Sequence, residues 1–168
     1  MNSERGNKVE TKGNKESKRR GFTTRAIHAG EEIDPATGAH NPPIYQTATF
    51  GFRDTADYQR AMEAGRYLYT RASNPTNRSL EAKLASLEEG EDALVAGSGM
   101  AAITATLLSL LSHGDHLLLS SAVYSVTEEF AIHTLPRFGI QVGRFDPTNL
   151  PALEGAIRSN TKAIYVET

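Results

Sequence analysis

The stretch that most constrains the fold is Ala93-Leu-Val-Ala-Gly-Ser-Gly-Met-Ala-Ala102. Its first four residues are apolar and predict a buried strand, the two glycines predict a tight turn, and the Ala- and Leu-rich residues up to Leu111 predict a helix. A helix that starts at such a turn presents unpaired backbone N–H groups and the positive end of its dipole. The sequence therefore predicts a phosphate-bearing ligand at residues 97–100, with the Ser98 hydroxyl as a further donor.

Besides the phosphate site, three other interpretations of the chain remain open on the residues alone. The pattern Gly97-x-Gly99-x-x-Ala102 fits a relaxed dinucleotide fingerprint, as in half of an oxidoreductase domain, but the next predicted strand ends in Ser120-Ser121 and not in an acidic residue. The glycines can also serve only to let the helix pack closely on the strand. The third interpretation is a non-catalytic interaction protein with a basic tail. A nucleoside triphosphate loop is excluded, because no Gly-Lys-Ser/Thr follows.

Strands and helices alternate through the rest of the chain, which predicts an α/β fold with a largely parallel sheet. Ligands on such sheets bind beyond the carboxyl ends of the strands, so Tyr124 and Glu167, which follow two of the strands, are candidate site residues. The chain stops at a strand end, and we expect it to be a fragment of a larger domain. The predicted strands are 93–96, 116–120, 140–145 and 163–166, and the predicted helices are 54–63, 74–90, 100–111, 124–138 and 150–158.

Residues 21–70 are rich in turn-forming residues and poor in core-forming ones, so we expect an extended arm over another surface, of this chain or of a partner subunit. At its end, an extended backbone would place Tyr67, Tyr69 and Arg71 on one side.

Charge and composition exclude several classes of function. The chain has 168 residues, a formal net charge of −2 and no cysteine, which argues against nucleic-acid binding, disulfides and thiolate metal sites. The five histidines have no metal-ligand spacing, and no apolar run is long enough to span a membrane. Residues 1–20 carry seven basic and three acidic side chains and predict a disordered basic tail.

Several motifs, in order, resemble the Cys/Met-metabolism (trans-sulfuration) family of pyridoxal-phosphate enzymes over about residues 22–168. The family includes cystathionine γ-synthase, the cystathionine lyases, methionine γ-lyase and the O-acylhomoserine sulfhydrylases. The motifs are Thr24-Arg-Ala-Ile-His-Ala-Gly30, Pro42-Pro-Ile-Tyr-Gln-Thr47, Tyr69-Thr-Arg-Ala-Ser-Asn-Pro-Thr76, Gly97-Ser-Gly-Met-Ala101 and Val123-Tyr124.

The resemblance implies a fold type I pyridoxal-phosphate domain and a role for each matching residue. Tyr69 and Arg71 resemble the pair that reaches the cofactor phosphate of a neighbouring subunit. The backbone at Ser98, Gly99 and Met100 resembles the phosphate cradle. Tyr124 resembles the residue that stacks on the pyridine ring and assists proton transfer, and Glu167 matches a position near the cofactor.

The resemblance also implies a cytoplasmic homo-oligomer, a dimer of dimers, in which residues 71–168 begin the large cofactor domain. The cofactor would be pyridoxal 5'-phosphate and the substrate a small sulfur-containing or O-acylated amino acid, which undergoes elimination or replacement at its β or γ carbon. The family's Schiff-base lysine and pyridine-pairing aspartate fall beyond Thr168, and Lys162 stands in the wrong context. We therefore expect the 168-residue chain to be inactive by itself. The run Tyr124-Ser125-Val126 differs from the small-residue runs common in the family and argues against methionine γ-lyase specifically.

Overall fold

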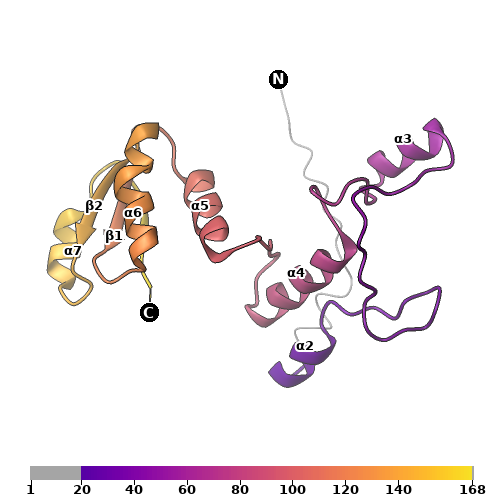
Figure 1. The fold of residues 1–168 in the computed structure, drawn as a ribbon. Helices are drawn as coiled ribbons and strands as arrows, with labels where there is room; N and C mark the ends of the chain where they lie inside the picture. Colours follow the sequence, from indigo (N-terminus) through magenta and orange to yellow (C-terminus); the bar gives the residue numbers. More distant parts are fainter. Residues whose placement is uncertain (1–19, 168) are drawn as a thin grey trace. The chain divides into compact units, whose positions relative to one another are not determined.

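The structure is a computed structural model, and residues 20–167 of it are described here. The predicted tail at residues 1–20 therefore lies almost entirely outside the described residues. The chain divides into two compact units, residues 1–95 and 96–168 (Figure 1). Each unit is described by itself.

The second unit contains a parallel sheet of three strands, which confirms the predicted α/β class. Strand β1 (His116–Ser120) is central and pairs with β2 (Gln141–Phe145) on one side and β3 (Thr161–Tyr165) on the other. All five β1 residues are buried, as expected of a central parallel strand rich in leucine.

Helices flank this sheet. They are α5 (Gly99–Leu110), α6 (Ser125–His133), the short 3₁₀ helix η1 (Leu135–Phe138) and α7 (Leu150–Ala156). Leu107 and Leu111 at the end of α5 pack with Leu117 and Leu119 of β1 and with Ala131 of α6 in one apolar core. The core thus fixes α5 and α6 on the sheet face to which Leu117 and Leu119 point.

Two predictions of secondary structure from the sequence were wrong. Residues 93–96 form no strand: Leu94 is 88% exposed, and no strand among the described residues pairs with the segment. An extended apolar segment becomes a strand only when a neighbour satisfies its backbone groups. The predicted helix 124–138 is two helices, because Pro136 lacks an N–H group and disfavours the α conformation in the residue before it.

The first unit is built from three helices and long connecting segments. The helices are α2 (Phe22–His28), α3 (Thr55–Glu63) and α4 (Pro75–Leu87). The Asp54 side chain caps α3 and Asn74 caps α4, as expected of these residue types at N-caps, so the predicted helices there are confirmed. Helix α2 was not predicted. It docks on α4 through Arg25, whose guanidinium is buried and donates to the carbonyl of Ser86 at 2.5 Å.

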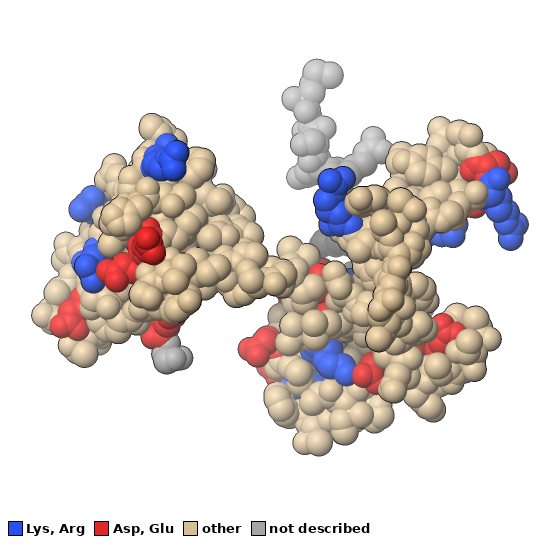
Figure 2. Space-filling view, in the orientation of Figure 1, with Lys and Arg blue, Asp and Glu red and all other residues tan. Residues whose placement is uncertain are grey.

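The predicted functional domains remain a prediction. The sequence placed a boundary between residues 70 and 71, whereas compactness groups α4 with residues 21–70. On the face drawn in Figure 2, lysines and arginines stand among aspartates and glutamates on both units, with no large patch of one sign.

Candidate functional site

Two predicted site residues meet at the carboxyl edge of the sheet. Tyr124 follows β1, Glu167 follows β3, and the Glu167 Oε2 atom accepts a hydrogen bond from the backbone N–H of Tyr124 at 2.7 Å. β1 and β3 are paired and parallel, so their carboxyl ends lie side by side. These two candidate residues, which follow different strands, therefore lie together at this edge, and their roles at a cofactor stay predictions.

The turn at Gly97 to Gly99 starts helix α5 as predicted. Ser98 is the N-cap, and its Oγ accepts a hydrogen bond from the N–H of Ala101 at 3.1 Å. Met100, in the first turn, lies beside the first turn of α6, because its sulfur accepts a hydrogen bond from the Thr127 hydroxyl at 3.8 Å. The start of α5 and the start of α6 therefore belong to one local region of the second unit.

The start of α5 has the donor set that a phosphate ester needs. The N–H groups of Gly99 and Met100 precede the intrahelical ladder, and within residues 20–167 neither is paired with an acceptor. A Cβ added at Gly97 or Gly99 would meet nothing within 4 Å, so the turn borders open space, and the first turn of the helix holds no acidic residue. These residues fit an anion.

Tyr124, the residue that precedes α6, is 54% exposed. No ring or guanidinium within the described part of the chain stacks on it. We call the N–H groups of Gly99 and Met100 the anion cradle. An exposed aromatic ring in the same region is chemically suited to stacking on a flat ligand. Its stacking role and its part in proton transfer stay predictions.

Tyr69 and Arg71 lie in the first unit. Tyr69 forms an isolated antiparallel bridge with Thr49, and the Arg71 guanidinium lies 5.0 Å from the centre of the Tyr69 ring. The condition of an extended backbone is not met through Arg71, because a turn closes there: the N–H groups of Ala72 and Ser73 both bond to the Tyr69 carbonyl. Both side chains are exposed. Their reach to a phosphate across a subunit interface stays a prediction.

A polar network holds the Tyr69–Arg71 segment against the start of α4. Asn74 donates through Nδ2 to the Tyr45 carbonyl and to Thr70 Oγ1, and its Oδ1 caps Thr76. Thr70 in turn donates to the carbonyl of Thr47 and, through its backbone N–H, to Ala48. Asn74 is 4% exposed, so the segment that bears Tyr69 and Arg71 is anchored by the hydrogen bonds of a buried side chain.

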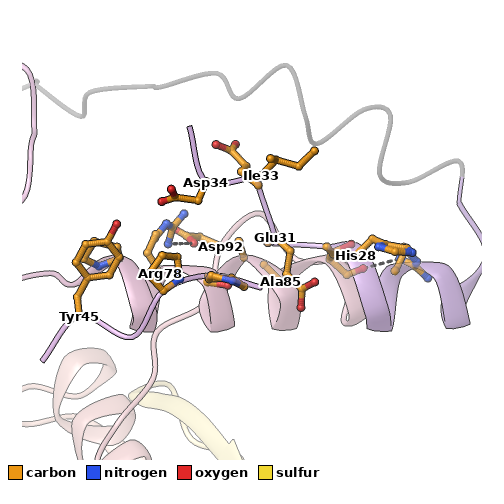
Figure 3. A pocket seen from close by; sticks show the side chains of 18 of the residues that line it. His28, Glu31, Ile33, Asp34, Tyr45, Arg78, Ala85 and Asp92 are labelled. Atoms are coloured by element: carbon orange, nitrogen blue, oxygen red, sulfur yellow. Dashed lines mark hydrogen bonds and ion pairs between the residues drawn. The ribbon is translucent and has the colours of Figure 1, made fainter. Parts of the chain in front are cut away.

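The first unit also contains a cavity of about 600 Å³ between the loops after α2 and helix α4 (Figure 3). It contains none of the predicted site residues. Arg78, which lines it, is paired with Asp92 at 2.6 Å and with Glu81 at 3.3 Å, and the Arg78 hydrogen bond holds the pKa of Asp92 below its ordinary value. Arg78 and Asp92 therefore already have each other as partners, and none of the residues of the predicted phosphate site lines this cavity.

Sequence reasoning missed two residues of the region around Tyr124. Thr127 is fully buried and contacts Met100, and the Tyr165 hydroxyl donates a hydrogen bond to Glu167 Oε1 at 2.7 Å. The sequence did contain a signal for Tyr165. Residues two apart along an extended strand point to the same side, so Tyr165 is expected on the same side as Glu167. Thr127 gave no such signal, since its role depends on how α5 packs against α6.

Within residues 20–167, no group of His, Asp and Glu side chains could hold a metal ion. Among the helices of that same range, none has the length and apolar character that crossing a bilayer would require.

Comparisons with known proteins agree with the motifs. The L-methionine gamma-lyase of Pseudomonas putida is 46% identical over 151 residues, which cover 88% of this chain and 38% of the relative. The O-acetyl-L-homoserine sulfhydrylase of Corynebacterium glutamicum is 41% identical over 88% of this chain and 35% of its own length. The chain thus spans less than two fifths of the length of each of these two relatives.

Solved structures show the same fold. The crystal structure of metB from Corynebacterium glutamicum matches with a TM-score of 0.82 and 34% identity, over 90% of this chain and 38% of that one. Cystathionine gamma-lyase from Lactobacillus plantarum, complexed with L-serine, matches with a TM-score of 0.76 and 38% identity, over 89% and 37%. The fold is therefore that of fold type I pyridoxal-phosphate enzymes.

A family profile decides between the open interpretations. The dinucleotide interpretation has no support, because β1 ends in Ser120, whose hydroxyl accepts from the N–H of Ala122, and no acidic residue stands there. The profile described as Cys/Met metabolism PLP-dependent enzyme matches residues 23–168. With the anion cradle, the exposed tyrosine and these relatives together, the chain belongs to the Cys/Met metabolism family of pyridoxal-phosphate-dependent enzymes.

Proposed function

We propose that this chain supplies part of the pyridoxal-phosphate site of an enzyme that eliminates or replaces a group at the β or γ carbon of a sulfur-containing or O-acylated amino acid. The observation that carries the proposal is the shared location of the α5 anion cradle, Tyr124 and Glu167 in the second unit. The Met100–Thr127 contact joins the cradle to α6, and the Tyr124–Glu167 bond joins α6 to the sheet edge.

Each residue has a role in this proposal that follows from its chemistry. The N–H groups of Gly99 and Met100 bind the phosphate, and the helix dipole adds to their attraction. Tyr124 stacks on the ring and excludes water from one of its faces. When bound, pyridoxal phosphate supplies the electron sink that stabilises negative charge at the substrate carbon.

Tyr69 and Arg71 contribute further donors to the phosphate, from a neighbouring subunit of a homo-oligomer. Arginine suits this task because its planar guanidinium makes paired bonds to phosphate oxygens. Both side chains are exposed, and among the described residues the ring contact of each is with the other. They are therefore available to bind a phosphate. A cytoplasmic location and a dimer of dimers are part of the same proposal.

The relatives of this chain act on several amino-acid substrates, as their names show. Relatives named L-methionine gamma-lyase, O-acetyl-L-homoserine sulfhydrylase and probable cystathionine gamma-synthase all match the chain. The several L-methionine gamma-lyases among them weaken the argument from Tyr124-Ser125-Val126 against that activity, which stays a prediction. We also expect the 168 residues alone to lack activity, since the lysine that the family uses has no counterpart at Lys162.

Titration of the intact protein with pyridoxal phosphate tests the cofactor. We expect a visible absorbance band, and about tenfold to a hundredfold weaker binding in Arg71→Ala, because a hydrogen bond between charged groups is lost. Release of thiol or of acetate from L-methionine, L-cystathionine and O-acetyl-L-homoserine then identifies the substrate. Absence of the band with the wild-type protein would overturn the proposal.

Mixed oligomers test the contribution of the neighbouring subunit. An Arg71→Ala subunit paired with a Tyr124→Ala subunit regains one intact site only if Arg71 acts across the interface. Activity of the mixture well above that of either variant is the expected result. Equal inactivity of the mixture would place Arg71 in its own subunit's site or outside any site.

A further inference from the structure

Glu167 is engaged through both of its carboxylate oxygens. Oε2 accepts from the backbone N–H of Tyr124, and Oε1 accepts from the hydroxyl of Tyr165, each at 2.7 Å. The first bond spans 43 residues and joins the end of β3 to the residue that starts α6. A carboxylate held in this way is oriented by protein groups on both sides, and its geometry is suited to fixing Tyr124 in place.

Tyr165 is itself fixed by the core beneath it. Its ring packs against the apolar cluster of β1, α5 and α6, and its residue pairs with Leu119 of the central strand. Burial, the largest cause, and the neighbouring Glu167 raise the pKa of the Tyr165 hydroxyl, so the hydroxyl stays protonated and able to donate. The neighbouring buried Thr127 side chain lowers the pKa of the same hydroxyl, but by less than burial raises it.

Thr127 extends this set of contacts to the anion cradle. Its hydroxyl lies 3.8 Å from the sulfur of Met100, in the first turn of α5. Tyr165 thus stands between the two halves of the site: Glu167 and Tyr124 on one side, Thr127 and Met100 on the other. These five residues come from β3, the segment after β3, α6 with its N-cap, and α5, so only the packed second unit brings them together.

We propose that Tyr165 and Glu167 are positioning residues that hold Tyr124 at the angle and distance at which its ring stacks on the cofactor bound at the start of α5. This inference rests on the proposed function for the identity of the ligand, but the bonds to Tyr124 can be tested without it. It also assigns Glu167 a different task from that of a direct cofactor ligand, because both of its carboxylate oxygens already accept bonds from the protein.

Hydrogen exchange at the Tyr124 amide of the intact protein, without added cofactor, tests the bond itself. Mass spectrometry with electron-transfer fragmentation resolves this single amide. We expect exchange about tenfold faster in Glu167→Ala and about threefold faster in Tyr165→Phe, since loss of one hydrogen bond changes an opening equilibrium by factors of this size. The matched control is Tyr58→Phe, which removes an exposed hydroxyl in the first unit and should change nothing.

Visible circular dichroism of bound pyridoxal phosphate tests the orientation of the ring. In Tyr165→Phe we expect a changed band and a kcat lower by about threefold to tenfold, with the cofactor Kd within about threefold of the wild-type value. A merely structural role would lower the amount of folded protein and leave the band of each bound cofactor unchanged.

The outcomes separate the two proposals. Tyr124 exchange that is unchanged in both Glu167→Ala and Tyr165→Phe overturns the positioning role, whatever the cofactor does. Altered exchange with an unchanged dichroism band also overturns it, because the ring is then not set by this contact. A wild-type protein without cofactor binding overturns the proposed function, and the exchange result then decides alone whether Glu167 and Tyr165 hold Tyr124.

Discussion

The amide nitrogen of Asn74 donates a hydrogen bond to the backbone carbonyl of Tyr45 at 3.1 Å, across 29 residues of chain. The same side chain caps helix α4 at the N–H of Thr76 and donates to Thr70, the residue between Tyr69 and Arg71. One buried amide therefore joins the start of a helix to the segment that carries the proposed phosphate-binding pair.

Replacing this side chain should be costly. Asn74→Ala removes the helix cap and leaves the Tyr45 carbonyl without this donor, and we expect it to lower the free energy of unfolding by about 2 kcal/mol. Urea denaturation of the intact protein measures the loss. Asn74→Asp is the matched control: it keeps the cap but not the donor, so it should lose about half as much. An Asn74→Asp protein as stable as wild type would show that the bond to Tyr45 contributes nothing.

Two glycines with the same φ angle allow the cost of backbone strain to be measured apart from the cost of a steric clash. Gly30 and Gly38 both have φ +73°, but a Cβ at Gly30 would collide with the Ser79 carbonyl of α4, whereas one at Gly38 would meet nothing within 4 Å. We expect Gly38→Ala to destabilise by about 1 kcal/mol and Gly30→Ala by about 3 kcal/mol. Thermal and urea unfolding check the difference. Equal losses would mean that the loop at Gly30 moves away from α4 at little cost.

Ser98 is expected to have separable roles in the helix cap and the anion cradle. Ser98→Ala removes the acceptor for Ala101 and should cost about 1 kcal/mol of stability. Ser98→Asp keeps a cap, so stability should be near that of wild type, but its charge would repel a phosphate. We expect binding of pyridoxal phosphate to weaken by more than about tenfold in Ser98→Asp. Tight binding by this variant would place the phosphate away from the start of α5.

His116 should make the stability of the protein depend on pH. Its side chain is fully buried in β1, where Nδ1 lies 2.8 Å from Thr161 Oγ1 and, among the described residues, Nε2 has no partner. Burial first, and the nearby Arg158 second, lower the pKa of His116 below its ordinary 6.5. The unfolded chain therefore binds a proton more readily than the folded one, and stability falls as pH decreases below 6.5.

Urea unfolding at pH values on either side of 6.5 measures this effect. His116→Asn, which cannot titrate, should flatten the dependence over that range. Arg158→Gln should flatten it only in part, because burial, the larger cause, remains. An unchanged slope in His116→Asn would assign the dependence to other groups.

Short-range sequence patterns were sufficient to predict most helices and strands of the second unit. The predicted strand 116–120 coincides with β1, and the predicted helix after the glycine turn differs from α5 by one residue at each end. These predictions succeed because hydrophobic periodicity, glycine and N-cap residues act within a few residues of where they stand. The same reasoning correctly placed Tyr124 and Glu167 at one edge of the sheet, since the carboxyl ends of parallel strands lie together.

Local patterns failed where the answer depended on a distant partner. The apolar residues 93–96 suggested a strand but lack a neighbour to pair with within the described chain. Helix α2 was not predicted, because its position depends on Arg25 reaching the carbonyl of Ser86, 61 residues away. Pairing partners and buried polar contacts of this kind are not encoded in short-range periodicity.

The sequence by itself determined the alternation of helices and strands, the glycine turn with its anion-binding helix start, and the motifs of the family. The tertiary structure alone decided that Glu167 bonds to Tyr124 and Tyr165, that Thr127 contacts Met100, and that Asn74 holds Tyr45. The physical reason is range. Helix caps and strand periodicity depend on neighbours in the chain, whereas these contacts depend on the register of β1 with β3 and on the packing of whole helices.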